Sequence, residues 1–162
     1  SIVEMLLKDS RLKPSAYRNF AIRHASIYGY ERIVKILLAD VRVDPSAKGN
    51  YAIRNAAANG HVEVVKLLIA DPRVDPSADH DYAIRHAAAL GHQEVVEVLL
   101  DDSRVDPSIY ANGLIRKASA SGYTGIVKLL LKDSRVDPSD SDNDALKQAV
   151  SHGHSGVVKL LM

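Results

Sequence analysis

The sequence contains no cysteine and no tryptophan, and phenylalanine occurs only once. Without cysteine, the chain offers neither a disulfide nor a thiolate that could act as metal ligand or nucleophile. We expect an intracellular, cytoplasmic protein, because that setting keeps thiols reduced and does not favour disulfide-stapled folds. No apolar run approaches the ~18 residues that a membrane-spanning helix needs, and no signal-peptide pattern opens the sequence. We therefore expect no membrane partner.

The chain also lacks an excess of either charge, with 21 lysines and arginines against 20 aspartates and glutamates. A balanced chain has no global field to recruit nucleic acid, so we expect no nucleic-acid partner. The charges are nevertheless unevenly distributed. Residues 1–49 carry nine basic and five acidic side chains, and five aspartates lie between Asp133 and Asp144. This gradient is compatible either with orientation of a charged partner or with ordinary solvated surface.

Prolines are few, but five of the six recur at intervals of 31 residues: Pro14, Pro45, Pro76, Pro107 and Pro138. A fixed period of this length is typical of stacked repeats, in which each unit contacts only its neighbours. We predict one array over residues 1–162, with full units at 14–44, 45–75, 76–106 and 107–137. Residues 1–13 and 138–162 form partial units, which gives five copies of a first helix and six of a second.

Three columns of equivalent residues define the first helix of each unit. An Asn or Asp column is expected to supply N-caps, because these side chains accept hydrogen bonds from first-turn N–H groups: Asn19, Asn50, Asp81, Asn112 and Asn143. An alanine column without exception is expected to let neighbouring helices approach closely: Ala25, Ala56, Ala87, Ala118 and Ala149. A glycine column is expected to end the helix in a left-handed residue: Gly29, Gly60, Gly91, Gly122 and Gly153.

The second helix carries an apolar face, which is Val64, Val65, Leu67 and Leu68 in the second full unit. Burial of four such side chains contributes roughly 6–12 kcal/mol, whereas ordering of one unit costs more, at ~1.5 kcal/mol per residue. A single unit is therefore unstable alone and depends on its neighbours. The connection to the next unit contains one valine, which we expect to anchor it in the core: Val43, Val74, Val105 and Val136.

The second unit contains Ala-Ala-x-x-Gly-His at 56–61 and Glu-Val-Val-Lys-Leu-Leu at 63–68, with equivalents in the other units. These motifs resemble the ankyrin repeat, and the resemblance extends over the whole chain. It implies an all-α, helix-turn-helix solenoid with short loop or hairpin connections, and a non-enzymatic role in protein binding. Two features depart from the family. The Thr-Pro-Leu-His opening is replaced by Tyr51-Ala52-Ile53-Arg54, and the period is 31 residues instead of about 33. We therefore expect a connection too short or irregular to form strands.

An arginine column near the start of the first helix replaces the histidine of the family: Arg23, Arg54, Arg85 and Arg116, followed by Lys147. A cation at this end of a helix opposes the macrodipole, so we expect compensating partners. The candidates are carbonyl groups of the connection or the aspartate column formed by Asp44, Asp75, Asp106 and Asp137. The alternative is a basic ladder that binds phosphate or an acidic peptide.

Motifs for catalysis or metal binding are absent or incomplete. His61, His92 and His154 follow the turn glycine and alternate with Tyr30 and Tyr123, which indicates packing and not metal ligation. Residues 140–144 imitate the start of a calcium loop, but the required glycine and the final acidic residue are missing. The sequence has no phosphate-binding loop, no nucleophile elbow and no His-Glu-x-x-His. We expect no enzyme activity, no cofactor and no metal.

A protein or peptide partner is the expected ligand, bound on the concave face and loop tips that the ankyrin resemblance implies. Positions that vary between units are the candidates, because the packing rule leaves them free. They are Tyr17, Arg18, Tyr28, Lys48, Asn59, Asp79, His80, Leu90, Tyr110, Ser121, Ser141 and His152. Among them the aromatic and large apolar side chains are favoured as anchors, since such residues dominate binding energy at interfaces.

A structural role is the alternative function. Apolar residues of partial units are expected to be exposed at both ends: Ile2, Val3 and Leu6 at one end, and Val157, Leu160 and Leu161 at the other. Terminal repeats normally have a polar outer face. We therefore expect either that the parent protein continues in both directions or that copies stack end to end through a heterologous contact, which extends into filaments when it does not close.

Overall fold

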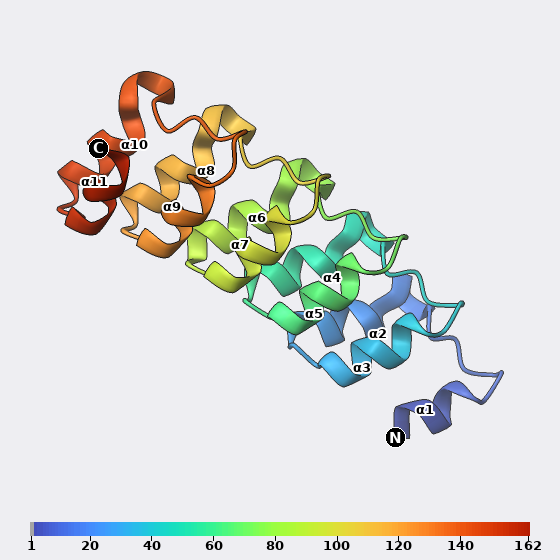
Figure 1. The fold of residues 1–162 in the computed structure, drawn as a ribbon. Coiled ribbons are helices and arrows are strands. Elements are labelled where there is room, and N and C mark those ends of the chain that lie inside the picture. The colour runs from blue at the N-terminus through green and yellow to red at the C-terminus, as the bar shows by residue number, and fades with distance from the viewer. Residues whose placement is uncertain (1) are drawn as a thin grey trace.

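The computed structural model describes residues 2–162, which form an elongated right-to-left staircase of helices (Figure 1). The helices within this range are α1 (Ile2–Leu7), α2 (Ala16–Ile27), α3 (Glu31–Leu38), α4 (Ala47–Ala58), α5 (Val62–Ile69), α6 (Ala78–Leu90), α7 (Gln93–Leu100), α8 (Ile109–Ala120), α9 (Thr124–Leu130), α10 (Asp140–Ser151) and α11 (Ser155–Leu161). Even-numbered helices are the predicted first helices, and odd-numbered helices are the second. The predicted five and six copies are confirmed.

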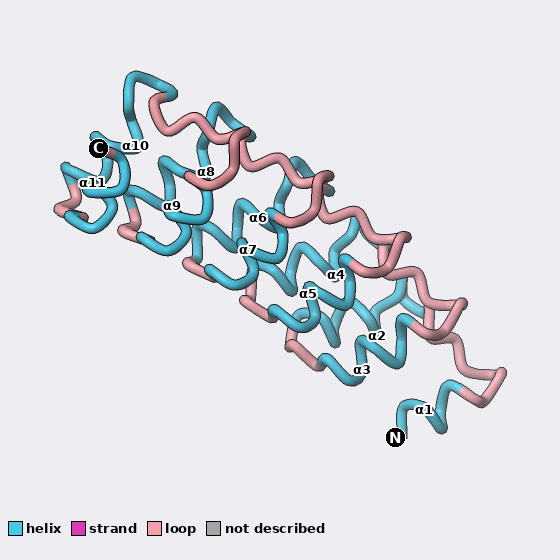
Figure 2. Tube along the Cα trace, viewed as in Figure 1, coloured by secondary structure: helices cyan, strands magenta, loops and turns pink. Residues whose placement is uncertain are grey.

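Long connections follow one edge of the array, and short turns follow the opposite edge (Figure 2). The 31-residue units contain no strand anywhere in residues 2–162, which confirms that the shortened connection does not form a hairpin. None of the helices in that range is both long enough and apolar enough to cross a bilayer.

The core is a continuous band between the two helix layers. Every member of the alanine column is buried, from Ala25 at 4% exposure to Ala149 at 0%. Each even-numbered helix packs against the even-numbered helix of the next unit, and each odd-numbered helix does the same in its own layer. Val43, Val74 and Val105 of the connections are also buried, as predicted, and Val136 packs against the same core at partial exposure.

At three of the turns that end a first helix, a histidine links neighbouring units, and at Gly91 the ring of Tyr123 takes its place. Gly60 has a φ of 76°, which is the left-handed conformation predicted for this column. The ring of His92 lies over Gly60, and its Nε2 is 3.1 Å from the carbonyl oxygen of Ala58 in the preceding unit. His61 and His154 make the same contact to Ile27 and Ala120, at 2.8 and 3.0 Å. The predicted packing role of these histidines is confirmed, and each adds a hydrogen bond between units.

A second arginine column, which we call the outer column, ties the connections together: Arg42, Arg73, Arg104 and Arg135. Arg73 donates from Nη2 to Asp71 Oδ2 at 2.6 Å and from Nη1 to the Val43 carbonyl of the preceding unit at 2.8 Å. The carbonyl contact 30 residues back recurs at every member of the column. In the first member, the side-chain hydrogen bonds from Arg42 lower the pKa of Asp40 to about 2.

The Asn and Asp column does not cap its own helix, so that prediction was wrong. Asn19 itself has a left-handed backbone, with φ 57°. Its Oδ1 accepts the backbone N–H of Asp44 in the next unit at 2.8 Å. The same contact recurs in three further units at 2.8–3.0 Å. The left-handed conformation turns the side chain away from the first turn of its helix and toward the next connection, where it satisfies a donor.

The two ends of the array differ more than predicted. At the N-terminal end Ile2 and Leu6 are 73% and 49% exposed, and Val3 is half-buried. At the other end Val157 is fully buried, which contradicts the expectation that it is exposed. It belongs to the core, and the helix that carries it, α11, packs against both α9 and α10. Leu160 and Leu161 are half-buried against the same core.

Candidate interaction surface

Three consecutive residues near the start of each even-numbered helix have a left-handed backbone, with φ between 50° and 63°. We call these segments the left-handed turns: 17–19, 48–50, 79–81, 110–112 and 141–143. Gly49 is the only glycine among them. For other residues this conformation costs roughly 1–2 kcal/mol each. Surrounding contacts must therefore hold the turns in place.

The first arginine column, which we call the inner column, supplies those contacts. Arg85 donates from Nε to the carbonyl of His80 at 2.7 Å and from Nη2 to that of Asp79 at 3.1 Å. Arg23 does the same to Arg18 and Tyr17, at 2.9 and 3.1 Å. Arg54 and Arg116 each donate to one turn carbonyl. Carbonyl groups of the connection are thus confirmed as partners of the column.

The other predicted partner, the aspartate column, was wrong. Asp44 accepts the backbone N–H and the hydroxyl of Ser46 at 2.9 and 2.6 Å, and the three later aspartates accept from their own serines in the same way. These short local hydrogen bonds engage the carboxylates, and the aspartates form no ion pair with the inner arginines in residues 2–162. The acidic partner of Arg54 is instead Asp79 in the next turn. Arg116 lies 3.7 Å from Asp144 and donates to Ser141 at 2.8 Å.

Aromatic rings alternate with the inner arginines along the array. The guanidinium carbon of Arg23 lies 5.3 Å from the ring centroid of Tyr51, and that of Arg54 lies 5.0 Å from Tyr82. Arg85 continues the series at 5.2 Å from Tyr110. Each contact is within the range of a cation–π interaction. We call this series the tyrosine–arginine stack, and it joins the turns of neighbouring units into one surface.

Sequence reasoning missed the tyrosine–arginine stack. The signal was present, because an aromatic residue precedes each arginine by three positions in Phe-Ala-Ile-Arg at 20–23 and Tyr-Ala-Ile-Arg at 51–54 and 82–85. From sequence alone the motif stands out only as a departure from the ankyrin pattern. The contact is hidden because the ring that each arginine meets belongs to the following unit.

The predicted partner-binding residues fall into two rows at opposite ends of the even-numbered helices. The turn row lies on the left-handed turns and contains Tyr17, Arg18, Lys48, Asp79, His80, Tyr110 and Ser141. The tip row lies where the same helices end and contains Tyr28, Asn59, Leu90, Ser121 and His152. About 12 Å of helix separates the rows. All of these residues are exposed except Ser121, which is half-buried.

The charge of the turn row changes along the array. The first two turns present Arg18 and Lys48, the third presents Asp79 and His80, and the last presents Asp142. Lys147 donates to Asp142 at 2.6 Å, and this hydrogen bond lowers the pKa of Asp142. A partner that lies along the row therefore meets basic groups at one end and carboxylates at the other.

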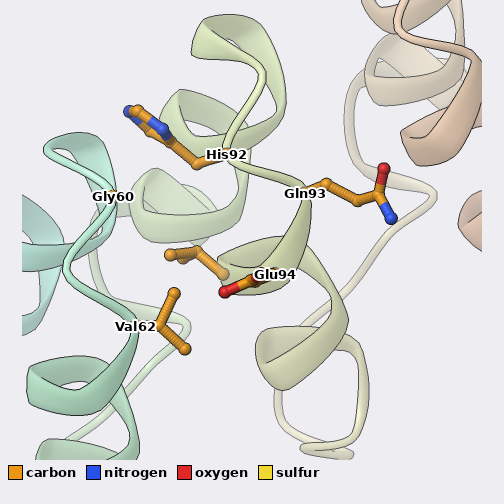
Figure 3. Close-up of a pocket in the computed structure, with 6 residues that line it drawn as sticks. Gly60, Val62, His92, Gln93 and Glu94 are labelled. Carbon is orange, nitrogen blue, oxygen red and sulfur yellow. The ribbon is translucent and has the colours of Figure 1, made fainter.

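A pocket of about 290 Å³ lies between two units at the tip edge of the array, where His92, Gln93 and Glu94 meet Gly60 and Val62. Figure 3 shows His92 directed toward Gly60 and Gln93 directed away from it. The imidazole of His92 is already engaged with the Ala58 carbonyl. The other polar side chains of the pocket, Gln93 and Glu94, form no nucleophile–base pair with it. The pocket therefore has no arrangement of groups for acid–base or nucleophilic chemistry.

The acidic turn near the C-terminus has structural partners. Asn112 donates to Asp140 at 2.8 Å, and this hydrogen bond lowers the pKa of Asp140. The rings of His152 and His154 are stacked with centroids 6.0 Å apart. Within residues 2–162 no three histidines, aspartates or glutamates are placed to hold a metal ion.

Comparison with known proteins places this architecture. Among curated proteins, none matches the sequence. A family model described as ankyrin repeats (3 copies) matches residues 22–111, which include α4, α5, α6 and α7 in full. Ankyrin repeats are generally protein-interaction modules. With more than half of its length matched and an all-helical array of repeated helix pairs, the chain belongs to the ankyrin-repeat family.

Proposed function

We propose that this array is a non-enzymatic scaffold that binds a partner protein or peptide through its turn row and tip row. One observation carries the proposal. The five left-handed turns repeat the same strained backbone, but they present different exposed side chains in each unit. Strain that persists at a surface motivates a functional hypothesis, and variable side chains on a rigid scaffold are typical of binding loops.

The tyrosine–arginine stack, which joins the left-handed turns of neighbouring units, supports this proposal. It connects units 1 to 4 through rings that lie 5.0–5.3 Å from the guanidinium groups of preceding units. A surface whose neighbouring turns are joined loses little conformational freedom when a partner binds, which favours affinity. The exposed aromatic members of the two rows, Tyr17, Tyr28 and Tyr110, are suited to act as anchors in the partner's surface.

The test compares the parent chain with three variants, each used as a purified bait to capture a partner from a cell lysate. In the turn-row bait Tyr17, Lys48 and His80 are changed to serine, and in the tip-row bait Tyr28, Asn59 and Leu90 are changed to serine. In the control bait three exposed residues of the second helices, Lys35, Glu97 and Lys128, are changed to serine. All three should keep the circular dichroism of the parent.

A partner held by the parent and the control bait, and lost by either row variant, is the expected result. Loss by one row variant alone would assign the contact to that row. Equal capture by all baits would place the contact elsewhere and overturn the proposal for both rows.

End-to-end association is the second candidate function. The exposed Ile2, Met5 and Leu6 favour it, as does the contrast between the basic residues 1–49 and the acidic turn at 140–144. A head-to-tail contact would bring these opposite charges together. Light scattering over a concentration range should then show growth into long species, with lower growth at high salt. A constant monomer mass would exclude this candidate.

A further inference from the structure

The column of aromatic residues ends after the third unit. Phe20, Tyr51 and Tyr82 occupy equivalent positions in the first three units, where the fourth has Gly113 and the fifth has Asp144. At Gly113 the surface opens into a pocket of about 180 Å³. Its walls are Arg85, Ile109, Tyr110, Gly113, Leu114 and Lys117.

The local backbone does not require glycine at this position. Gly113 is absent from the residues with positive φ. A Cβ atom built there would lie 3.4 Å from the Cβ of Tyr110 and 3.8 Å from Nη2 of Arg116, which are ordinary contact distances. Glycine inside a helix weakens it relative to alanine. The fourth unit therefore retains a less stable residue that keeps the pocket open.

The side chain one helical turn later indicates what fits above Gly113. In the first unit the ring of His24 stacks on Phe20 at 4.6 Å, and in the third the ring of His86 stacks on Tyr82 at 3.6 Å. Lys117 occupies the same position in the fourth unit. It is exposed and has no hydrogen-bond or ion-pair partner within residues 2–162. A ring above Gly113 would give this ammonium group an aromatic face.

The cations at the rim indicate the charge of the ligand. Arg85 and Lys117 both line the pocket, and its lining includes no acidic residue. Arg85 uses Nε and Nη2 for the turn carbonyls, and its guanidinium group forms no ion pair with a carboxylate in the part of the chain described. A carboxylate next to the inserted ring would meet two positive groups.

We propose that the Gly113 pocket receives an aromatic side chain from a partner peptide whose flanking residues are acidic. The ring takes the place that Phe20, Tyr51 and Tyr82 fill in the first three units. It lies against Tyr110 and beneath Lys117, and the flanking carboxylates pair with Arg85 and Lys117. This inference rests on the proposed scaffold function and names the partner chemistry at one point of its turn row.

Two small probes test the chemistry directly by amide chemical-shift titration of the whole chain. The first is 3-phenylpropionate, which carries a ring and a carboxylate. The second is phenethylammonium, which carries a ring of the same size and a positive charge. A ligand of this size has a limited affinity, so we expect a Kd of about 1 mM for 3-phenylpropionate. The shifts should saturate and centre on Gly113, Leu114 and Lys117, and phenethylammonium should bind at least fivefold more weakly.

Three variants sharpen the test. Gly113→Tyr introduces the side chain of the second and third units, fills the pocket and should abolish the saturable shifts without lowering the melting temperature. Lys117→Gln should weaken 3-phenylpropionate about threefold to fivefold, as expected for loss of one charge-assisted contact. Lys128→Gln, which removes an exposed lysine from α9, should leave its affinity unchanged.

Several results would overturn the inference. Equal affinity for both probes would exclude the acidic ligand, and unchanged binding to Gly113→Tyr would exclude the pocket. Absence of saturable shifts at these residues would exclude both. The scaffold function is judged separately: a captured partner that depends on the turn row but binds Gly113→Tyr as well as the parent would leave that function standing and refute the pocket.

Discussion

The outer and inner arginine columns share one residue type and one period, but they hold different parts of the molecule. Each outer arginine pairs with an aspartate two residues earlier and donates to a carbonyl of the preceding unit, as Arg73 does to Asp71 and Val43. Each inner arginine donates to a turn of its own unit, as Arg85 does to His80, and Arg85 then contacts the ring of Tyr110 in the next unit. The outer column therefore fixes how units stack, and the inner column fixes the turns that present variable side chains.

The largest expected effect comes from removal of an outer arginine. Arg73→Ala eliminates bonds to two backbone carbonyls of the preceding unit and leaves Asp71 without its partner. Hydrogen bonds that involve charged groups contribute more than neutral ones, so we expect a loss of about 2–3 kcal/mol in the free energy of unfolding. Urea denaturation followed by circular dichroism measures it.

The chain contains a matched control for that substitution. Arg11 forms the same pair with Asp9 at 2.7 Å, but its side chain is 89% exposed and no bond to a carbonyl of another unit is present in residues 2–162. Arg11→Ala should cost much less than Arg73→Ala, as expected for an exposed ion pair. Equal losses for Arg11→Ala and Arg73→Ala would show that the aspartate pair, and not the contact between units, carries the stability of the outer column.

Removal of an inner arginine should have a smaller effect. Arg85→Ala frees the carbonyls of Asp79 and His80 and removes the cation–π contacts to Tyr82 and Tyr110. These groups lie at the surface, where water replaces part of what is lost. We therefore expect a decrease of about 1–2 kcal/mol in unfolding free energy. An unchanged melting temperature together with lost partner binding would show that the inner column is a binding ladder instead.

Part of this fold could be predicted from the sequence, and the left-handed turns show why the rest could not. The alanine, glycine and valine columns were predicted correctly because burial and helix ends leave a local signature at each position. The left-handed turns left only a partial signature: the Asn or Asp at their third position tolerates positive φ, but Tyr17 and Lys48 have no such preference. Contacts made 25 residues away stabilise them, such as that of Asn19 with Asp44. Conformation imposed by a neighbouring unit does not appear in the propensity of the residues that adopt it.

The candidate site follows the same division. The exposure of the predicted turn-row and tip-row residues could be predicted from their variation between units. Their division into two groups, one in the connections and one after the alanine column, also follows from the sequence, whereas the left-handed backbone of the first group does not. The aspartate column was assigned to the wrong partner for a related reason: a serine two residues away reaches Asp44 before any arginine does.

The same substitution, aspartate to asparagine, should have opposite effects on stability at Asp71 and at Asp81. The hydrogen bond from Arg73 lowers the pKa of Asp71 below its ordinary value of 3.8, whereas burial raises the pKa of Asp81. The ionised form of Asp71 therefore stabilises the fold above pH 3.8 and ceases to do so as the pH falls below it. The ionised form of Asp81 destabilises the fold at neutral pH, and this penalty disappears as the pH falls through its raised pKa.

Asp71→Asn should thus lower the unfolding free energy at pH 7 by about 1–2 kcal/mol, and Asp81→Asn should raise it by about 1 kcal/mol. Asparagine at 81 keeps the oxygen that accepts the N–H of Asp106, as it does elsewhere in that column. At pH 5 the loss for Asp71→Asn should persist, because Asp71 is still ionised in both the folded and the unfolded chain, and it should shrink only at pH 3. The gain for Asp81→Asn should shrink as the pH falls through the raised pKa of Asp81. The same sign for both variants at pH 7 would contradict the assignment of opposite pKa shifts.

The smallest expected effect comes from a substitution at Gly113, which stands where the first three units have an aromatic residue. Gly113→Ala adds a methyl group at ordinary contact distance from Tyr110 and restricts the unfolded chain. We expect a gain of about 0.5–1 kcal/mol in unfolding free energy. Gly122→Ala is the matched control in the same helix pair, because φ is 72° there and a Cβ would lie 2.6 Å from Nδ1 of His154. That variant should lose stability by at least about 1 kcal/mol.

The sign of the Gly113→Ala difference decides what the glycine does. A gain would show that the fold tolerates a side chain at this position and that the open pocket is maintained at a cost in stability, as residues retained for binding often are. A loss would show that packing around Tyr110 and Arg116 requires glycine. The interruption of the tyrosine–arginine stack would then be explained by folding alone, without reference to a ligand.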